Sequence, residues 1–396
     1  MKTLSVLFLI ITTSVVLHAQ PLIWNVGSLN NARNNQSSDA VKLLLREADK
    51  ELTQTLITVV DKQMTPPGGD KHDYMSMGRY WWPNPNTNDG LPYIRKDGVS
   101  NPEIEKLDRI PLAQMTRGIK LLSLAYFITK DEKYATKAVD NLRKWFLDQK
   151  TRMNPHLNYG QTVPGHNNGM GRGFGIIDTY SFVEMLEGVE LLKTSKKFTK
   201  KDQQGLHDWF CAYLDWMLTS PIGKEAFEAP NNHGTAFDVQ VVRYALFVGK
   251  EMTARTFLDE FPVRRLFAQI EPNGSQPLEL ARTTAFGYSV FNLDHIIDMC
   301  SIGKTLGYDL LNVQSADGRS VIKAVEFLLP FAGKAVADFP YQQIRDWDKV
   351  QQEYALLLYR VDKFLPKPLY GTYYNRFVGT NTGSNSKCTN NNFING

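Results

Sequence analysis

The stretch PLAQMTRGIKLLSLAYFITKDEKYATKAVDNLRKWFL, residues 111–147, decides the fold class of this chain. Apolar residues recur every three or four positions both before and after residues 129–130, which is the spacing of two amphipathic helices. Because the link Thr129-Lys130 is so short, the two helices must run antiparallel as a helical hairpin. The sequence therefore predicts that helical hairpins are the building unit.

The same spacing recurs along most of the chain. Further helices are predicted over residues 38–62, 176–193, 201–218, 235–247, 254–270, 288–306, 320–331 and 349–361. Ser38 is a plausible cap for the first of them. No alternating strand pattern separates these segments. We therefore expect an all-α fold of the (α/α) toroid type, an incomplete barrel of helical hairpins with an inner and an outer ring and long loops lining a cleft.

Length and composition set the limits of this prediction. The chain has 396 residues, of which 42% are hydrophobic and 22% charged, an ordinary globular balance. Single domains usually stop growing at about 250–300 residues, so either two domains or one large toroid is expected. The net charge is +4, and no dense basic run suggests binding to nucleic acid. A local cationic groove for an acidic ligand is compatible with this charge.

The two ends of the chain differ from the rest. Residues 1–19 begin with Lys2 and continue into an apolar run, as in a secretory signal peptide cleaved after Ala19. The run is shorter than the ~20 residues that a membrane span needs, so stable membrane insertion is not expected. The sequence thus predicts a periplasmic or secreted protein, a toroid domain over residues 20–375, and a flexible, Asn- and Ser-rich tail over residues 376–396.

Neither a metal nor a cofactor is indicated. The chain has three cysteines, Cys211, Cys300 and Cys388, which read as lone thiols or as one disulfide with its pairing left open. His72, His156 and His166 are the histidines that could bind a metal, but their spacing is unspecific. We therefore expect no cofactor and no metal in the candidate site.

The first candidate binding element is the loop HDYMSMGRYWWPNP, residues 72–85. Its candidate contacts are Tyr74, Arg79, Tyr80, Trp81 and Trp82. Aromatic rings can stack on the apolar faces of sugars, and an arginine can pair with a carboxylate. The alternative is a proline-rich loop that folds back on the core with its rings buried.

The second candidate element is YGQTVPGHNNGMGRGFG, residues 159–175. Its glycines resemble a phosphate loop only weakly, because no strand is predicted before it and no Lys-Ser/Thr pair follows. A tight loop that approaches a ligand fits better, with Asn167, Asn168 and Arg172 as polar contacts. Simple turn chemistry is the alternative.

Two further segments supply groups for catalysis. NNHGTAF, residues 231–237, places Asn232 and His233 at a helix start, where a cap and a structural histidine are the alternatives. LELARTTAFGYSVFNLD, residues 278–294, contains Arg282 and Tyr288, and Gly287 is expected to break the run between two elements. Together these segments offer an amide, an imidazole, a guanidinium and a phenol.

That set suits the abstraction of a proton next to a carboxylate. The C5 hydrogen of a uronic acid becomes removable when its carboxylate is neutralised, which Asn232, His233 and Arg282 can do as donors. A base must then take the proton and an acid must protonate the O4 leaving group. Tyrosine has a reference pKa near 10, and a neighbouring Arg and His are expected to lower the pKa of Tyr288.

At these residues the sequence resembles the alginate-lyase-like polysaccharide lyases, and within them most closely polysaccharide lyase family 38. DYMSMGRYWWPNP, NNHG, ELARTTAFGY and the hairpin DEKYATKAVDNLRKWF carry the resemblance, which spans roughly residues 70–341. It implies a helical toroid that cleaves β-1,4-linked uronic acid polymers, glucuronan or alginate/polymannuronate, by β-elimination to give 4,5-unsaturated ends. An acidic polysaccharide would be the partner of a monomeric enzyme.

The resemblance also implies roles for individual residues. Asn232 and His233 match the carboxylate-neutralising pair, Arg282 the arginine near the centre, and Tyr288 the catalytic tyrosine. The chain departs from the classical members after Asn-His, where it has Gly-Thr-Ala rather than a more aromatic stretch, so the exact substrate stays open. In mannuronate and glucuronate the C5 hydrogen and O4 lie on one side of the ring, so Tyr288 can serve as base and acid. Guluronate would need a second base, plausibly His233.

Two other functions are compatible with the residues alone. A glycoside hydrolase on a similar toroid would use two carboxylates, with Asp178 and Glu184, or Asp346 and Asp348, as the candidate pairs. A non-catalytic sugar-binding protein would use the same aromatic loop. The product distinguishes them, because hydrolysis creates no double bond and binding leaves the polymer intact.

Overall fold

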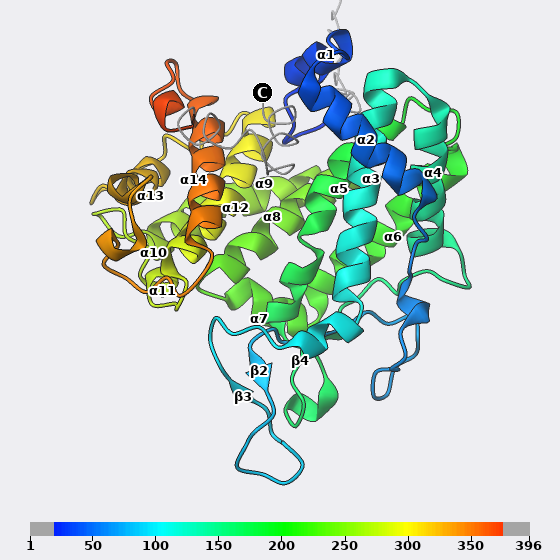
Figure 1. Ribbon diagram of the computed structural model, residues 1–396, viewed down its shortest axis with the longest axis horizontal. Coiled ribbons are helices and arrows are strands. Elements are labelled where there is room, and N and C mark those ends of the chain that lie inside the picture. Colours follow the sequence, from blue (N-terminus) through cyan, green and yellow to red (C-terminus); the bar gives the residue numbers. More distant parts are fainter. Residues whose placement is uncertain (1–19, 375–396) are drawn as a thin grey trace, which may run out of the picture.

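The computed structural model describes residues 20–374, which form a curved body of packed helices (Figure 1). The predicted signal peptide, residues 1–19, and the whole of the predicted tail, residues 376–396, lie outside these residues. Within the described part, no helix is long and apolar enough to cross a membrane.

The hairpin that decides the fold forms as predicted. Helix α3 covers Arg109–Thr129, and α4 covers Glu132–Leu142 and continues into a π-helical turn. Lys130 takes a left-handed conformation with φ 59°, and the Asp131 side chain then caps α4 by accepting from the Lys133 amide. The reversal therefore needs only these two residues, and α3 packs along both α4 and α5, Ser181–Leu192.

Further helices extend this hairpin into an open ring, so the prediction of an all-α toroid is confirmed. They are α1 (Val26–Asn34), α2 (Asp39–Thr53), α6 (Lys200–Thr219), α7 (Pro221–Glu228), α8 (Asn232–Phe247), α9 (Glu251–Phe261), α10 (Phe267–Gln269), α11 (Pro277–Leu280), α12 (Ala285–Thr305), α13 (Val321–Leu328) and α14 (Trp347–Asp362). Helix α8 packs against both α9 and α12, and α12 also packs against α14. Their apolar faces share one large buried cluster.

Two predicted helix boundaries are wrong. Ser38 does cap α2, but the helix ends at Thr53, well before residue 62. The residues that follow are rich in β-branched side chains, and Thr58 with Asp61 forms the capping box of a separate short turn. Gly287 does not break the chain, because it lies inside α12, which begins at Ala285. Tyr288 therefore sits in the first turn of a long helix.

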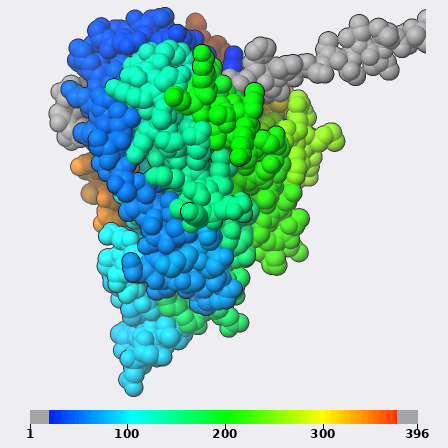
Figure 2. All heavy atoms as spheres, turned by 90° about the vertical axis from the view of Figure 1, so that its right-hand side faces the viewer, coloured from blue at the N-terminus to red at the C-terminus, as the bar shows by residue number. Residues whose placement is uncertain are grey.

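Four short strands form two pairs, and one of these pairs joins the two predicted loops. Strand β1, Met75–Met77, pairs in parallel with β4, Tyr159–Thr162, and thereby ties the aromatic loop to the second loop. Strand β2, Trp81–Trp82, pairs antiparallel with β3, Ile94–Arg95. Figures 1 and 2 show that this part of the chain projects from the end of the helical body opposite α1.

A buried ion pair fixes the start of the described chain. Arg243 Nε donates to Glu187 at 2.8 Å, and both side chains are almost fully buried. The other Glu187 oxygen accepts from the amides of Ile23 and Trp24. Cys211 and Cys300 are free thiols, as expected for lone cysteines, whereas Cys388 lies outside the described residues.

Candidate active site

The sharp turn between α11 and α12 brings Arg282 and Tyr288 together. Arg282 lies in the link after α11, and its Nη2 donates to the Tyr288 hydroxyl at 2.9 Å. Its guanidinium carbon also lies 3.8 Å from the centre of the Tyr288 ring. Both side chains are half-buried, so the phenol is not enclosed in the core. The predicted meeting of these two residues is therefore present.

Asp97, which the sequence did not single out, holds Arg282 in place. The carboxylate accepts from Arg282 Nη2 at 2.6 Å and from Nε at 3.1 Å, a two-pronged contact. It also accepts from the amide and hydroxyl of Thr283. Burial acts to raise the pKa of Asp97, but the hydrogen bonds from Arg282 and Thr283 outweigh it and hold that pKa below its usual value. Asp97 is thus a carboxylate anion.

The loop approaches this closely because of Gly98. Its φ is +76°, and a Cβ at this position would lie 2.4 Å from the Thr283 hydroxyl oxygen. A side chain here would push the loop away from α11. Gly98 therefore allows the close approach that places Asp97 in contact with Arg282.

The phenol of Tyr288 also contacts the aromatic loop. The hydroxyls of Tyr80 and Tyr288 lie 3.0 Å apart. The prediction that neighbouring cations lower the pKa of Tyr288 is wrong for the free enzyme. Burial and Tyr80 raise that pKa by more than Arg282 lowers it. Tyr288 is therefore a neutral phenol at neutral pH, hydrogen-bonded between a guanidinium and a second phenol.

His233 lies in the first turn of α8 within electrostatic range of Arg282. Burial, and then the positive charges of Arg282 and Arg172, lower the pKa of His233 to about 3. Its ring meets Phe174 edge-on at 4.5 Å, and its Nδ1 is buried without a hydrogen-bond partner. The imidazole is thus neutral and a weak base. Phe174 also lies beside Arg172, and Arg172 lies beside Trp81, so these contacts connect His233 to the aromatic loop that contacts Tyr288.

Asn232 occupies a different position from the one predicted. Its side chain is fully buried, and Nδ2 donates to Glu279 at 2.7 Å while its backbone amide donates to the other carboxylate oxygen at 2.8 Å. Asn231, and not Asn232, is the cap of α8. Direct contact between Asn232 and a substrate is therefore not available in this structure. Asn232 instead joins the start of α8 to α11.

Glu279 is the second residue that the sequence did not single out. It is 2% exposed, and burial raises its pKa to about 7 although Asn232 and Arg282 act to lower it. Its position three residues before Arg282 lets one short segment hold both the start of α8 and Arg282.

The raised pKa of Glu279 predicts a stability change with pH. Because the folded-state pKa lies above the ordinary value, stability is full below about pH 4.5 and falls as pH rises to 7, by about 3 kcal/mol. Glu279→Gln removes this ionisation but replaces one of the two oxygens that accept from Asn232 by an NH2 group, a cost that does not depend on pH. The stability of the variant relative to the wild type, measured by urea unfolding, should therefore be higher at pH 8 than at pH 4.5. Glu105→Gln, at an exposed carboxyl, is the control. An equal wild-type-to-variant difference at both pH values would contradict the prediction.

The aromatic loop divides into core and surface residues. Tyr74 is fully buried and donates to Asp178, so the prediction that it contacts substrate is wrong. Tyr80, Trp81 and Trp82 are half-buried. The Trp81 ring lies edge-on to His166, and Trp82 Nε1 donates to the Val99 carbonyl. The surface-facing part of the predicted set is therefore Tyr80, Trp81 and Trp82.

The second loop divides in the same way. Asn167 and Asn168 are exposed and left-handed, with φ 48° and 50°, and Asn167 Nδ2 donates back to the Gly171 carbonyl. Turn chemistry accounts for both. Arg172 instead lies beside the site, with its guanidinium 5.6 Å from the Trp81 ring and 5.3 Å from the Phe174 ring.

The other candidate groups have structural roles. Asp178 is buried and accepts from Tyr74 and Ser76, while Glu184 pairs with Lys120. Asp346 and Asp348 are exposed. His72, His156 and His166 contact the Arg152 carbonyl, Asp73 and the Tyr93 carbonyl, respectively. Within residues 20–374 no group of His, Cys, Asp and Glu side chains is arranged to hold a metal ion.

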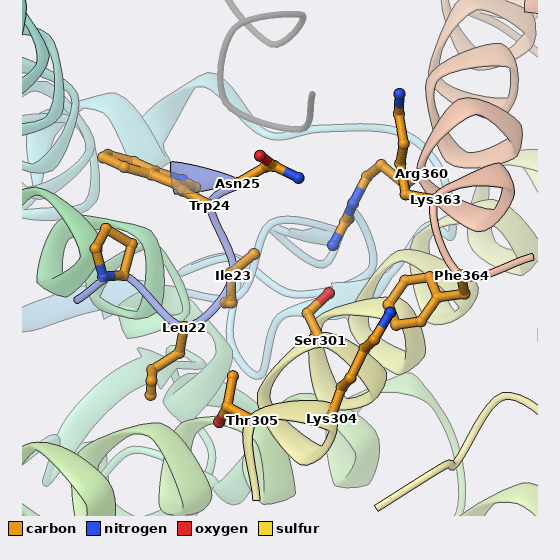
Figure 3. Close-up of a pocket in the computed structure, with 11 residues that line it drawn as sticks. Leu22, Ile23, Trp24, Asn25, Ser301, Lys304, Thr305, Arg360, Lys363 and Phe364 are labelled. Carbon is orange, nitrogen blue, oxygen red and sulfur yellow. The ribbon is translucent and has the colours of Figure 1, made fainter. Parts of the chain in front are cut away.

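A cavity of about 270 Å³ lies elsewhere (Figure 3). Residues 21–25, the last turn of α12 and the end of α14 line it. Ser301 in its wall is thirteen residues beyond Tyr288 on the same helix, roughly 20 Å along the axis. This cavity is therefore at the opposite end of α12 from the candidate site.

Comparison with known proteins adds to this geometry. The model of the family described as alginate lyase matches residues 58–337. The structure of an alginate lyase from Bacteroides ovatus is 51% identical, with a TM-score of 0.90 over 95% of this chain and 99% of that one. Alginate lyase A1-III from Sphingomonas species A1 is 14% identical, with a TM-score of 0.61 over 90% and 92%, which supports the fold alone. No curated protein matches the chain.

The matched segment includes Asp97, His233, Glu279, Arg282 and Tyr288. The chain belongs to the alginate lyase family and is a polysaccharide lyase.

Proposed function

We propose that this lyase cleaves β-1,4-linked polymannuronate or glucuronan by β-elimination, with Tyr288 as the group that moves the proton. The observation that carries the proposal is the Arg282 guanidinium, which donates to Tyr288 and to Asp97 through the same nitrogen. A cation held against the phenol stabilises the phenolate that must remove a carbon-bound hydrogen. Both substrates fit because they present the C5 hydrogen and O4 on one side of the ring.

In the proposed reaction the Tyr288 phenolate takes the C5 proton of the sugar whose O4 is the leaving oxygen. The C4–O4 bond then breaks, the electron pair of the C5–H bond becomes the C4–C5 double bond, and the Tyr288 hydroxyl returns its proton to O4. Arg282 and His233 face the substrate carboxylate and hold the charge that develops on it. The products are one chain with a new reducing end and one chain with a 4,5-unsaturated sugar at its non-reducing end. Tyr288 is again a phenolate.

Guluronate is a poorer candidate substrate. Its C5 hydrogen and O4 lie on opposite sides of the ring, so a second group must act as base. His233 is our candidate for that task, but with a pKa of about 3 it is a weak base at neutral pH. We therefore propose preference for mannuronate or glucuronate over guluronate.

A panel of polymannuronate, glucuronan, polyguluronate and hyaluronan tests the proposal, with the absorbance of the unsaturated end as the signal. The expected result is fast release of unsaturated ends from polymannuronate or glucuronan and slow release from polyguluronate. Shortened chains without the double bond, or polyguluronate as the best substrate, would overturn it.

We also propose that the enzyme is exported, because residues 1–19 have the pattern of a secretory signal. Mass determination of the protein secreted by its host cell, with cleavage after Ala19, is the corresponding test.

A further inference from the structure

Two half-buried arginines beside the candidate site lack a carboxylate partner. Among residues 20–374, the other buried and half-buried arginines each lie within 4.0 Å of an Asp or Glu oxygen. Arg79 and Arg172 have no such ion pair in this part of the chain. Removing a guanidinium from water without an anion is unfavourable, so these positions are suited to an anion that a ligand brings.

Arg79 lies on the tyrosine side of the site. Its Nε is buried and has no hydrogen-bond partner. Burial first, and then the charge of Arg109, lower the pKa of Arg79, and Arg345 acts in the same direction. Arg109 and Arg345 each have a carboxylate partner, Asp178 and Asp346, whereas Arg79 has none among the described residues. The next residue, Tyr80, interacts with Arg79, and its hydroxyl lies 3.0 Å from that of Tyr288, so Arg79 lies near the catalytic phenol.

Arg172 lies on the histidine side. Its Nε donates to the Gln161 carbonyl at 3.0 Å, which fixes the direction of the side chain. The guanidinium lies beside the rings of Trp81 and Phe174, and the Phe174 ring meets His233. Glu225 acts on Arg172 through space but forms no ion pair with it, and its carboxylate accepts from the Gly173 amide. Arg172 therefore has no directly paired carboxylate among the described residues.

The two arginines adjoin different parts of the site and so mark two positions. Arg79 precedes Tyr80, whose hydroxyl contacts that of Tyr288, whereas Arg172 lies beside the rings of Trp81 and Phe174, and Phe174 contacts His233. A polymer with a carboxylate on every sugar offers several anions in a row, while an alternating polymer of charged and neutral sugars offers half as many.

We propose that Arg79 and Arg172 are separate carboxylate subsites for the sugars next to the one that is cleaved, so that the enzyme selects polymers charged on consecutive sugars. The proposal rests on the proposed function and names the feature of the polymer that the site recognises. Both arginines act in binding. Their loss should therefore raise KM and leave kcat within a few fold.

The test uses mannuronate tetramers and matched tetramers in which the carboxyl group of one sugar next to the reacting sugar is reduced to an alcohol, while the reacting sugar keeps its carboxylate. Arg79→Gln and Arg172→Gln are compared with the wild type and with Arg46→Gln, an exposed arginine on α2. Steady-state KM and kcat are measured with each tetramer. Binding is also measured by calorimetry in the Tyr288→Phe background, where turnover does not interfere.

Each arginine variant should raise KM for the fully charged tetramer by roughly 10- to 100-fold, the usual effect of losing a charged hydrogen bond. Each variant should also lose discrimination against the tetramer that lacks its own carboxylate, and only against that one. Arg46→Gln should behave as the wild type. Two results would overturn the proposal. One is that the KM increase caused by the substitution and the KM increase caused by the missing carboxylate simply multiply when combined. The other is an unchanged KM in both variants.

Failure of the proposed function gives a different result. If no unsaturated end forms but calorimetry shows the same pairing of arginine and carboxylate, the subsites stand and the reaction is wrong. If unsaturated ends form at unchanged KM, the reaction stands and the subsites are wrong.

Discussion

Tyr288→Phe is expected to lower kcat for the release of unsaturated ends by roughly 10³-fold, within the range for removal of a general acid–base group. Phenylalanine keeps the ring that lies against Arg282 but has no oxygen to take the C5 proton or to protonate O4. Binding of the polymer should change little, so the loss should appear in kcat and not in KM. Release of unsaturated ends is followed by their absorbance.

The pH profile distinguishes a catalytic phenol from a structural one. Because the pKa of Tyr288 is raised, the phenolate is a minor species at neutral pH and its population increases tenfold with each pH unit. Wild-type kcat/KM should therefore rise steadily from pH 7 to 9.5. Tyr80→Phe, the matched control, removes a neighbour that raises the pKa of Tyr288, and should move this rise to lower pH while activity is retained. Tyr288→Phe with more than a tenth of wild-type kcat would exclude the role.

The helical hairpin was predictable because its signal is local. The apolar spacing of residues 111–147 and a two-residue link determine α3 and α4 with no information from the rest of the chain. The end of α2 was not predictable in the same way, because apolar spacing continues past Thr53 while the β-branched residues favour an extended backbone. Strands of two to four residues, such as β2 and β4, fall below the length at which a pattern of alternation exists.

The site shows which parts of function a sequence contains. Arg282 and Tyr288 are six positions apart, so their contact could be anticipated, although Gly287 was given the wrong role. Asp97 lies 185 positions from Arg282 in the sequence. With Gly98 it has the pattern of a turn, and the structure does contain a turn there. Only the fold brings that turn to α11.

Burial was the property that the sequence could not supply. The polar groups around Tyr288 suggested a lowered pKa, but the desolvation that reverses the sign depends on Tyr80 and on the packing of two distant segments. The same holds for Asn232, which was predicted to contact the substrate, and for Glu279, which was not singled out. Both are buried against each other.

Arg282→Lys is the second substitution with a large expected effect, a loss of roughly 10²- to 10³-fold in kcat, as for other donors aimed at developing charge. The guanidinium donates to both Asp97 oxygens and to the Tyr288 hydroxyl at once. An ammonium keeps the charge but is a single point without the planar fork, so it cannot hold Asp97 in two places and also reach the phenol. The phenolate would then lose its donor. The rise of kcat/KM with pH should therefore occur at higher pH in the variant than in the wild type.

Asp97→Asn distinguishes two roles of Arg282, which are to anchor the loop of Asp97 and to donate to the Tyr288 hydroxyl. The amide keeps the shape and one oxygen for Arg282 or Thr283, but the negative charge that fixes the guanidinium is gone. Because Arg282 itself remains, kcat should fall only by about tenfold, the loss of one charged hydrogen bond. If Arg282 served only to anchor the loop of Asp97, the two variants would show equal losses of activity and equal shifts in thermal unfolding. A larger kcat loss in Arg282→Lys at matched stability is the outcome that places the guanidinium in the reaction, because stability reports the shared anchor and only the phenol contact differs.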